Sequence, residues 1–292
     1  MRVDTINAAG VVGAGTMGLG IAIASARGGV RTLLVDESEA RVQLAVSEAE
    51  SFFERSLDKG KLTLEQRNAA MDNLVAASFP DLAGCDIVIE AVFEDMATKA
   101  DLIGQLDEVC RADAVFASNT STLPITGIAA NSIRPERVVG LHFCLPAQLM
   151  KLVEATRGLR TSDEAFSTAW HYCLGIGQKP IETKDTPGFI LNHFVIPFHN
   201  RAIRMVEAGI APAEKIDQAV KIAFGHSMGP LELLDLVGLD TQERLCTAFF
   251  EATNDPELAC PNLVRQMVAA GWLGKKSGRG FYHYENTKTF GT

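Results

Sequence analysis

Two residues capable of acid–base chemistry interrupt apolar sequence in the middle of the chain. His142 lies in the run GLHF, Glu154 ends the run MKLVE, and Pro146 lies between them. An imidazole beside a carboxylate is a common general acid–base pair, because the carboxylate stabilises the protonated ring and fixes its tautomer. The spacing is too long for one helical face, but a strand, a turn at Pro146 and a returning segment could bring the two side chains together. A hydrogen-bonded core histidine and a surface glutamate at a strand end would explain the same pattern.

A glycine-rich turn near the N-terminus predicts a second site, for a dinucleotide. The run GAGTMG follows a short apolar run and opens a helix-length stretch. Gly13 would permit the tight turn, Gly15 would let backbone approach a pyrophosphate, and Gly18 would let the helix pack closely on the strand. The helix N-terminus would favour the negative charge of the pyrophosphate. We include Thr16 and Met17, which lie between the last two glycines, in the predicted cofactor site.

An acidic residue follows at the position that such a site requires. Asp36 ends the next apolar run, RTLLVD. Its carboxylate would accept hydrogen bonds from both ribose hydroxyls of an adenosine and would repel a 2′-phosphate, so NAD is preferred over NADP. The alternative is a surface aspartate that caps the next helix.

The elements that must position these residues change in character along the chain. Short apolar runs at 9–12, 31–36, 86–92, 114–118 and 137–143 read as buried strands and alternate with helix-length stretches, including a pair at about 38–58 and 63–76. This alternation is typical of a parallel sheet with helices on both faces. Beyond KPIETKDTPG, helical periodicity dominates at 188–208, 212–223, 230–251 and 261–270. We therefore expect an α/β domain over 1–185, with an inserted helical pair at about 38–76, and an all-α domain over 186–292.

Composition excludes several classes of function. The net charge of −9 and the pI of about 5.2, without any Lys/Arg block, argue against a nucleic-acid surface or a polybasic membrane patch. We find neither a signal-peptide pattern nor an apolar run of the ~20 residues that a membrane helix needs. The six cysteines are scattered without a CxxC pair, which indicates reduced thiols and a cytoplasmic location.

Six further stretches resemble one family, the 3-hydroxyacyl-CoA dehydrogenases, and most closely its compact bacterial members that act on 3-hydroxybutyryl-CoA. They span nearly the whole chain in the family's order. The resemblance implies a Rossmann-type NAD-binding domain followed by a helical substrate domain that forms a homodimer. The stretches are EAVFEDMATK, SNTSTL, GLHF with MKLVE, KDTPGFILN, GPLELLDLVGLD and GKKSGRGFYHY.

The resemblance also implies a set of catalytic residues. His142 would be the base that takes the proton of the 3-hydroxyl, and Glu154 would be its paired carboxylate. Ser121 would hold the substrate oxygen, and Asn192 would hydrogen-bond the reacting oxygen or the thioester carbonyl. Uncharged donors suit these positions because they stabilise a developing alkoxide without competing for the proton. The alternatives are a helix N-cap for Ser121, whose STLP context looks like a helix start, and a polar contact in a helical turn for Asn192.

Four more residues fall on family positions near the cofactor: Glu94, Lys99, Asn119 and Lys276. Glu94 and Lys99 could instead be a first-turn acid that complements the helix dipole and a solvated lysine. An exposed basic turn explains Lys276 almost equally well. For the phosphates of coenzyme A, the helical pair supplies Ser51 and Lys59, with Lys61 beside them, although lysines at a helix C-terminus are also ordinary caps.

The chain departs from the family pattern around the histidine. The run is HFCLP, so Leu145 replaces an asparagine that contacts the nicotinamide end, and Cys144 replaces an aromatic residue. Losing one neutral hydrogen bond costs about 0.5–1.5 kcal/mol, which is too little to abolish cofactor binding. Cys144 lies two residues from His142, so strand alternation would place both side chains on one face. His193 replaces a family arginine, and together with His199 and His226 it could suggest a metal site. No carboxylate or cysteine lies at ligand spacing beside them, so surface or capping histidines are expected instead.

These observations predict an NAD-dependent oxidoreductase that converts (S)-3-hydroxyacyl-CoA, of short chain length, reversibly to 3-oxoacyl-CoA. A first alternative is a dehydrogenase of a 3-hydroxy acid without coenzyme A, such as a gulonate- or carnitine-like substrate. A second alternative is a nucleotide-binding protein without turnover.

Overall fold

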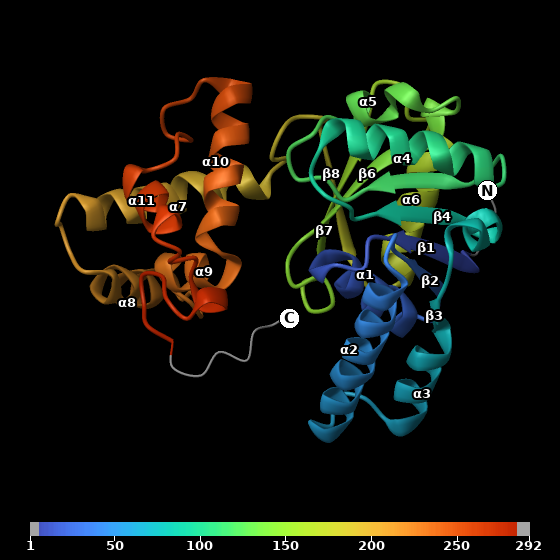
Figure 1. The fold of residues 1–292 in the computed structure, drawn as a ribbon, viewed down its shortest axis with the longest axis horizontal. Coiled ribbons are helices and arrows are strands. Elements are labelled where there is room, and N and C mark those ends of the chain that lie inside the picture. Colours follow the sequence, from blue (N-terminus) through green and yellow to red (C-terminus); the bar gives the residue numbers. More distant parts are fainter. Residues whose placement is uncertain (1–5, 285–292) are drawn as a thin grey trace. The chain divides into compact units, whose positions relative to one another are not determined.

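The computed structural model describes residues 6–284 of the chain. The chain divides into two compact units, one that ends at Thr186 and one that begins at Pro187. Figure 1 shows the first as a sheet between helices and the second as a group of helices. Each unit is described by itself.

The first unit is built on an eight-stranded sheet with the order β3-β2-β1-β4-β5-β6-β7-β8. All neighbouring strands are parallel except β6 and β7, which run antiparallel. The predicted strands are present. Their continuous apolar runs suit a parallel sheet whose two faces are both covered by helices, because every side chain of the strand is then buried. The strands are β1 (Ala8–Val12), β2 (Arg31–Val35), β3 (Leu74–Ala76), β4 (Ile87–Glu90), β5 (Val115–Ser118), β6 (Val138–Phe143), β7 (Leu152–Arg157) and β8 (Lys179–Thr183).

Helices cover both faces of this sheet and form a separate apolar core on each, which confirms the predicted α/β class. On one face lie α1 (Thr16–Arg27), α2 (Glu39–Asp58), α3 (Leu64–Asn73) and α6 (Asp163–Gly175). On the other lie η1 (Phe79–Gly84), α4 (Met96–Val109), α5 (Ile125–Ile128) and the short turn η2 (Ala129–Asn131). A further short turn, η3 (Pro135–Arg137), leads into β6.

The sheet is wider than the sequence predicted. Three strands, β3, β7 and β8, come from segments for which no strand was expected, and β3 replaces the end of the helix predicted to run to 76. Leu74 is buried and pairs with Thr32 of β2, so the end of this stretch gains ladder hydrogen bonds that a further helical turn would not provide. Local periodicity cannot reveal such pairing, because the partner strand lies far away in sequence.

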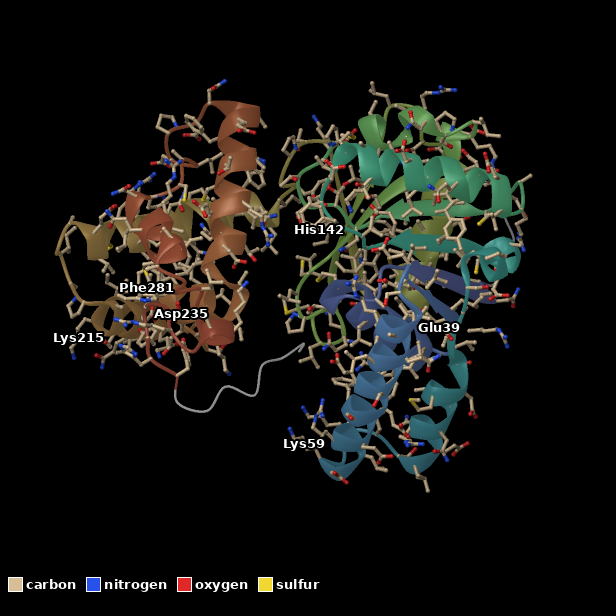
Figure 2. All side chains as sticks on the ribbon, in the orientation of Figure 1. Glu39, Lys59, His142, Lys215, Asp235 and Phe281 are labelled. Carbon is tan, nitrogen blue, oxygen red and sulfur yellow. The ribbon has the colours of Figure 1, made fainter. Side chains whose placement is uncertain are left out.

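The second unit contains α7 (Leu191–Glu207), α8 (Ala213–Phe224), α9 (Pro230–Val237), α10 (Leu239–Thr253), α11 (Asn262–Ala269) and the turn η4 (Lys275–Ser277) around one apolar core. The stretch predicted as one helix over 230–251 is broken at Gly238, whose φ of +106° only glycine adopts readily. Buried Asp235 of α9 accepts hydrogen bonds from the amides of Phe281 and Tyr282, both at 2.9 Å, and so ties down the tail (Figure 2).

Two observations bear on the environment of the chain. No helix within residues 6–284 is long and apolar enough to cross a bilayer. All six cysteines are buried free thiols, which here pack as small apolar groups.

Candidate active site

The register between β6 and β7 brings the histidine and the glutamate together. His142 and Glu154 are direct partners across the antiparallel pair, and His142 Nδ1 lies 2.8 Å from Glu154 Oε2. The predicted strand, turn and returning segment are therefore present. The surface-glutamate alternative is wrong, because Glu154 is only 1% exposed. A buried carboxylate within hydrogen-bond distance of the ring orients it and stabilises positive charge on it.

The second ring nitrogen of His142 points to Ser121. The distance from Ser121 Oγ to His142 Nε2 is 3.1 Å. The N-cap alternative for Ser121 is wrong, because α5 begins later and its cap residue is Pro124. The free amides at the start of α5 are instead satisfied by Asp185, which accepts from Ile125 at 2.7 Å and from Thr126 at 3.0 Å.

This line of serine, histidine and carboxylate could in principle perform two kinds of chemistry. With Glu154 accepting the Nδ1 hydrogen, Nε2 carries the lone pair of a general base. The same order of groups activates a serine nucleophile in acyl transfer, which also needs backbone donors for an oxyanion. Here the amides of Ser121 and Thr122 both donate to the Glu94 carboxylate, at 2.8 and 3.1 Å. These two amides already donate to a carboxylate, and the negative charge of that carboxylate would repel an oxyanion. The arrangement therefore favours proton transfer over acyl transfer.

The glycine turn has the geometry that a dinucleotide requires. Gly13 has a φ of +103°, and a Cβ at Gly18 would lie 1.7 Å from the Gly13 carbonyl oxygen. A Cβ at Gly15, by contrast, would meet no atom within 4 Å. Thr16 begins α1, so the space beside Gly15 lies at a helix N-terminus that suits a pyrophosphate. Met17 lies in the first turn of the same helix and packs against the core.

Asp36 lies against the same turn. Its Oδ2 accepts from the amide of Ala14 at 2.8 Å and its Oδ1 from the amide of Ser38 at 3.1 Å. The helix-cap alternative is wrong, because the N-cap of α2 is Ser38. Asp36 is thus held beside the glycine turn. Each of its oxygens can still accept a further hydrogen bond, as the hydroxyls of an adenosine ribose would require.

Glu94 accepts from the amide of Ser121, and Lys99 lies beside Glu94. The alternatives of a first-turn acid and a solvated lysine are both wrong. Lys99 is 1% exposed and donates to both oxygens of Glu90, at 3.0 and 2.8 Å, so it is not solvated. Glu94 precedes α4 instead of lying in its first turn, and Lys99 Nζ is 3.3 Å from its Oε2. Burial raises the pKa of Glu90, and Lys99 opposes this rise.

Sequence reasoning missed Glu90 and Ser118, which end β4 and β5 as register partners and hydrogen-bond each other through their side chains. A usable signal was present. Each is a polar residue at the carboxyl end of an apolar strand, where ligand sites of parallel sheets gather.

The other predicted site residues are more dispersed. Asn119 follows β5, and its Oδ1 accepts from the amide of Phe143 at 2.9 Å. Asn192 is the second residue of α7, and Lys276 lies in η4 with its Nζ 2.5 Å from Asp240 Oδ1. Both belong to the second unit. Ser51 and Lys59 are exposed on α2, with Lys59 at its C-terminal end, away from His142 (Figure 2).

The departures from the family pattern lie beside the histidine. The Cys144 sulfur, one ring nitrogen of His142 and one carboxylate oxygen of Glu154 lie within 4.8 Å of one another. Cys144 is thus beside His142, as predicted, although β6 ends one residue earlier, at Phe143. Burial, followed by the charge of Glu154, raises the pKa of Cys144 to about 12, so the thiol is neutral and adds no charge to the site. Leu145 is 44% exposed.

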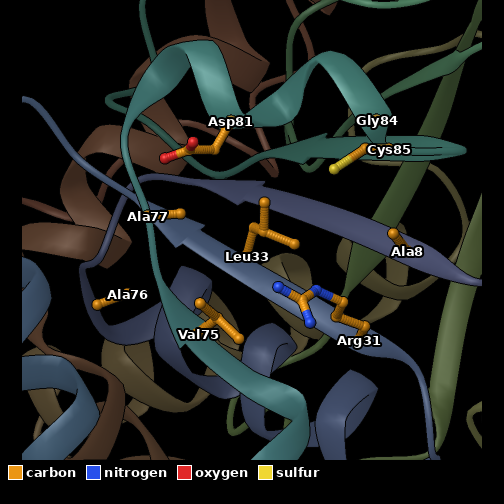
Figure 3. A pocket seen from close by; sticks show the side chains of 9 residues that line it. All are labelled: Ala8, Arg31, Leu33, Val75, Ala76, Ala77, Asp81, Gly84 and Cys85. Carbon is orange, nitrogen blue, oxygen red and sulfur yellow. The ribbon is translucent and has the colours of Figure 1, made fainter.

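A cavity of about 380 Å³ lies elsewhere in the first unit, between η1 and strands β1 to β3 (Figure 3). None of the predicted site residues lines it. Its walls are Ala8, Arg31, Leu33, Val75, Ala76, Ala77, Asp81, Gly84 and Cys85.

Comparison with known proteins decides the family. Residues 8–186 match the 3-hydroxyacyl-CoA dehydrogenase NAD binding domain, and residues 188–284 match the C-terminal domain of the same family. The chain belongs to the 3-hydroxyacyl-CoA dehydrogenases. It is thus an NAD-dependent oxidoreductase acting on a CH–OH group, and the resemblance drawn from the six stretches is confirmed.

Individual relatives agree over their full length. The chain is 43% identical to a 3-hydroxybutyryl-CoA dehydrogenase of Mycobacterium tuberculosis, covering 96% of this chain and 99% of the relative. It is 40% identical to a probable 3-hydroxybutyryl-CoA dehydrogenase of Bacillus subtilis, covering 94% and 96%. The crystal structure of (S)-3-hydroxybutyryl-CoA dehydrogenase from Ralstonia eutropha superposes with a TM-score of 0.90 at 39% identity, covering 97% of this chain and all of that one.

Proposed function

We propose that this dehydrogenase oxidises short-chain (S)-3-hydroxyacyl-CoA, of the size of 3-hydroxybutyryl-CoA, to 3-oxoacyl-CoA, reversibly, with His142 and Glu154 as its general acid–base pair. The observation that carries the proposal is the line from half-buried Ser121 Oγ through buried His142 to buried Glu154 Oε2, with distances of 3.1 and 2.8 Å. The names of the relatives described above support the substrate class.

His142 is placed to accept a proton at Nε2. The 3-hydroxyl of the substrate would approach this nitrogen in place of the Ser121 hydroxyl, which would then donate to the substrate oxygen. Bound NAD supplies the acceptor for the hydride that leaves the same carbon. The proton moves to His142 as the C–O bond gains double-bond character, and Glu154 stabilises the resulting imidazolium. In the reverse direction, the imidazolium returns the proton to the alkoxide.

Several remaining assignments belong to this proposal. The cofactor would bind Gly13, Gly15, Thr16, Met17, Gly18 and Asp36, with Asn119, Lys276 and the Glu94–Lys99 pair on its nicotinamide side. Asn192 would bind the reacting oxygen or the thioester carbonyl, and Ser51 and Lys59 the coenzyme A. The homodimer and the cytoplasmic location stay predictions.

Substrate class can be tested by following NADH absorbance with acetoacetyl-CoA, free acetoacetate and other 3-oxo acids in turn. We expect rapid oxidation of NADH with the thioester and at least ~100-fold lower kcat/KM with the free acids, because binding energy from the carrier is used at the reacting carbon. Oxidation with the free acids alone would instead support the carrier-free alternative.

Chain length can be tested in the same assay with 3-oxoacyl-CoA substrates of increasing length. We expect the highest kcat/KM with the four-carbon substrate. A maximum at a longer chain would contradict the short-chain assignment and leave the acid–base pair untouched. No thiol should be released from acetoacetyl-CoA, because the filled amides beside Ser121 oppose acyl transfer.

A further inference from the structure

The turn that carries Ser121 is built around one carboxylate oxygen. Glu94 Oε1 accepts from Thr120 Oγ1 at 2.6 Å, from the Ser121 amide at 2.8 Å, and from the Thr122 amide and Oγ1, both at 3.1 Å. Four donors from three consecutive residues thus converge on a single atom. The position of this atom fixes the backbone of the turn.

The other oxygen of Glu94 is held by a buried cation. Lys99 Nζ lies 3.3 Å from Glu94 Oε2, and it also donates to Glu90 and to the carbonyl oxygen of Val92. Glu90 and Lys99 are fully buried. Glu90 is the last residue of β4 and pairs with Ser118 at the end of β5. Lys99 is thereby fixed, and it fixes Glu94 in turn. Although burial opposes ionisation, Lys99 and the donors of the turn hold the pKa of Glu94 below its ordinary value.

The turn reaches the proposed acid–base pair through Ser121, whose Oγ lies 3.1 Å from His142 Nε2. The amide nitrogen and the hydroxyl oxygen of Ser121 are separated by only three bonds, N–Cα, Cα–Cβ and Cβ–Oγ. A shift of the amide away from Glu94 therefore moves the hydroxyl, and a hydrogen bond weakens steeply once its distance or angle is lost.

We propose that Glu94 is a positioning residue that holds Ser121 against His142, with Lys99 keeping its carboxylate in place. This inference rests on the proposed function in one respect, namely that Ser121 and His142 handle the reacting oxygen. It adds to the cofactor contact proposed for the Glu94–Lys99 pair, because positioning acts on turnover through Ser121 even when the cofactor is saturating.

Glu94→Gln is a sharp probe of this role. A carboxylate presents acceptors to both sides, whereas an amide must turn its NH2 group either toward the Lys99 ammonium or toward the donors of residues 120–122. Either orientation breaks contacts without changing the size of the side chain. Because the Glu94 side chain is 36% exposed, the variant should fold. Thr122→Val is a second, milder variant that removes the 3.1 Å bond from the Thr122 hydroxyl to Glu94 Oε1. The matched control is Glu108→Gln, on the exposed side of α4.

A double-mutant cycle with Ser121→Ala provides the kinetic test, using acetoacetyl-CoA and NADH. At saturating NADH we expect Glu94→Gln to lower kcat about 10- to 100-fold, with Thr122→Val intermediate. In the Ser121→Ala background, Glu94→Gln should lower kcat by less than about twofold, because the contact it positions is already absent. Glu108→Gln should match the wild type. Independent, multiplying losses of kcat at saturating NADH would overturn the proposal.

An NMR test does not depend on turnover. The ring nitrogens of His142 can be followed in 15N-histidine-labelled protein, with the resonance assigned by His142→Gln. Glu94→Gln should shift the Nε2 resonance in the direction and to the extent that Ser121→Ala does. A wild-type Nε2 resonance in Glu94→Gln, beside a shifted one in Ser121→Ala, would refute positioning. Lack of oxidation with acetoacetyl-CoA would refute the proposed substrate but leave this measurement valid.

Discussion

Glu154 and Ser121 contact the ring nitrogens of His142 and orient the ring. Glu154 faces Nδ1 because the two residues are register partners, and Ser121 faces Nε2 because its turn follows the neighbouring strand β5. Neither partner is close in sequence. The site therefore depends on the order of strands in the sheet, while its chemistry depends on a few side chains.

Replacing the proposed base tests this arrangement at its centre. We expect His142→Gln to lower kcat about 10²- to 10⁴-fold, because glutamine cannot accept the proton. Affinity for NADH should be nearly unchanged, since the glycine turn and Asp36 are untouched. Steady-state kinetics and fluorescence titration measure the two quantities. Near-native turnover would refute the assignment of the base.

Cys144 offers a chemical test of the same site. Alkylation should inhibit the enzyme, because the added group would crowd His142, whose ligand atom lies within 4.8 Å. Because the pKa of Cys144 is raised to about 12, only a small thiolate fraction exists at neutral pH, and labelling should accelerate about tenfold per pH unit between 7 and 9. Mass spectrometry locates the label, and Cys144→Ala serves as the control. Full activity after stoichiometric labelling of Cys144 would dispose of the idea.

The turn between β1 and α1 shows how one element serves both fold and function. Gly18 is required for packing, since a Cβ there would lie 1.7 Å from a backbone oxygen. Gly15 faces open space, so its lack of a side chain serves no contact within the fold. Glycines a few residues apart are thus conformationally and chemically distinct.

Two substitutions in this turn should separate these roles. Gly15→Val should leave the melting temperature within about 2 °C of the wild type but weaken NADH binding at least ~10-fold, because its side chain would fill the space expected for the pyrophosphate. Gly18→Ala should instead lower the melting temperature by several degrees, since overpacking costs about 1–3 kcal/mol. Calorimetry and fluorescence titration measure the two effects. Equal losses of stability in both variants would contradict the distinction.

At the scale of the whole molecule, the two units have separate apolar cores. The second unit carries a buried group that makes its stability depend on pH. The second unit buries His199, which is 3% exposed on α7, so the expectation of a surface or capping histidine is wrong at this position. Burial lowers the pKa of His199 from 6.5 to about 4, and a contact with Gln242 only partly opposes this change. The folded unit therefore resists protonation that the unfolded chain accepts.

Acid should consequently destabilise the helical unit. Below pH 6.5 the unfolded state binds a proton at His199 that the folded state refuses, so stability falls as pH drops from about 6.5 toward about 4, by about 3 kcal/mol in all. The window from pH 6.5 to 5 is diagnostic, because most carboxylates titrate below it. His199→Leu should remove this dependence in thermal unfolding. An unchanged pH dependence in His199→Leu would contradict the assignment.

The sequence by itself determined the α/β class, the glycine turn with Asp36 and the presence of a helical half, because these depend on local periodicity and on backbone freedom at named glycines. It also supplied His142 and Glu154 as a pair, since a titratable residue in an apolar run is conspicuous. Family motifs covering nearly the whole chain supplied the class of reaction, which the full-length relatives confirmed.

Only the tertiary structure decided which polar groups meet. The edge strand β3, the Glu90–Ser118 contact and the Glu94-centred turn all depend on pairings between segments distant in sequence. A short-range pattern cannot tell a solvated lysine from one buried between carboxylates, because burial is a property of the surroundings and not of the residue. The chain encodes the chemistry in its residue types, and the register of its strands brings those residues into contact.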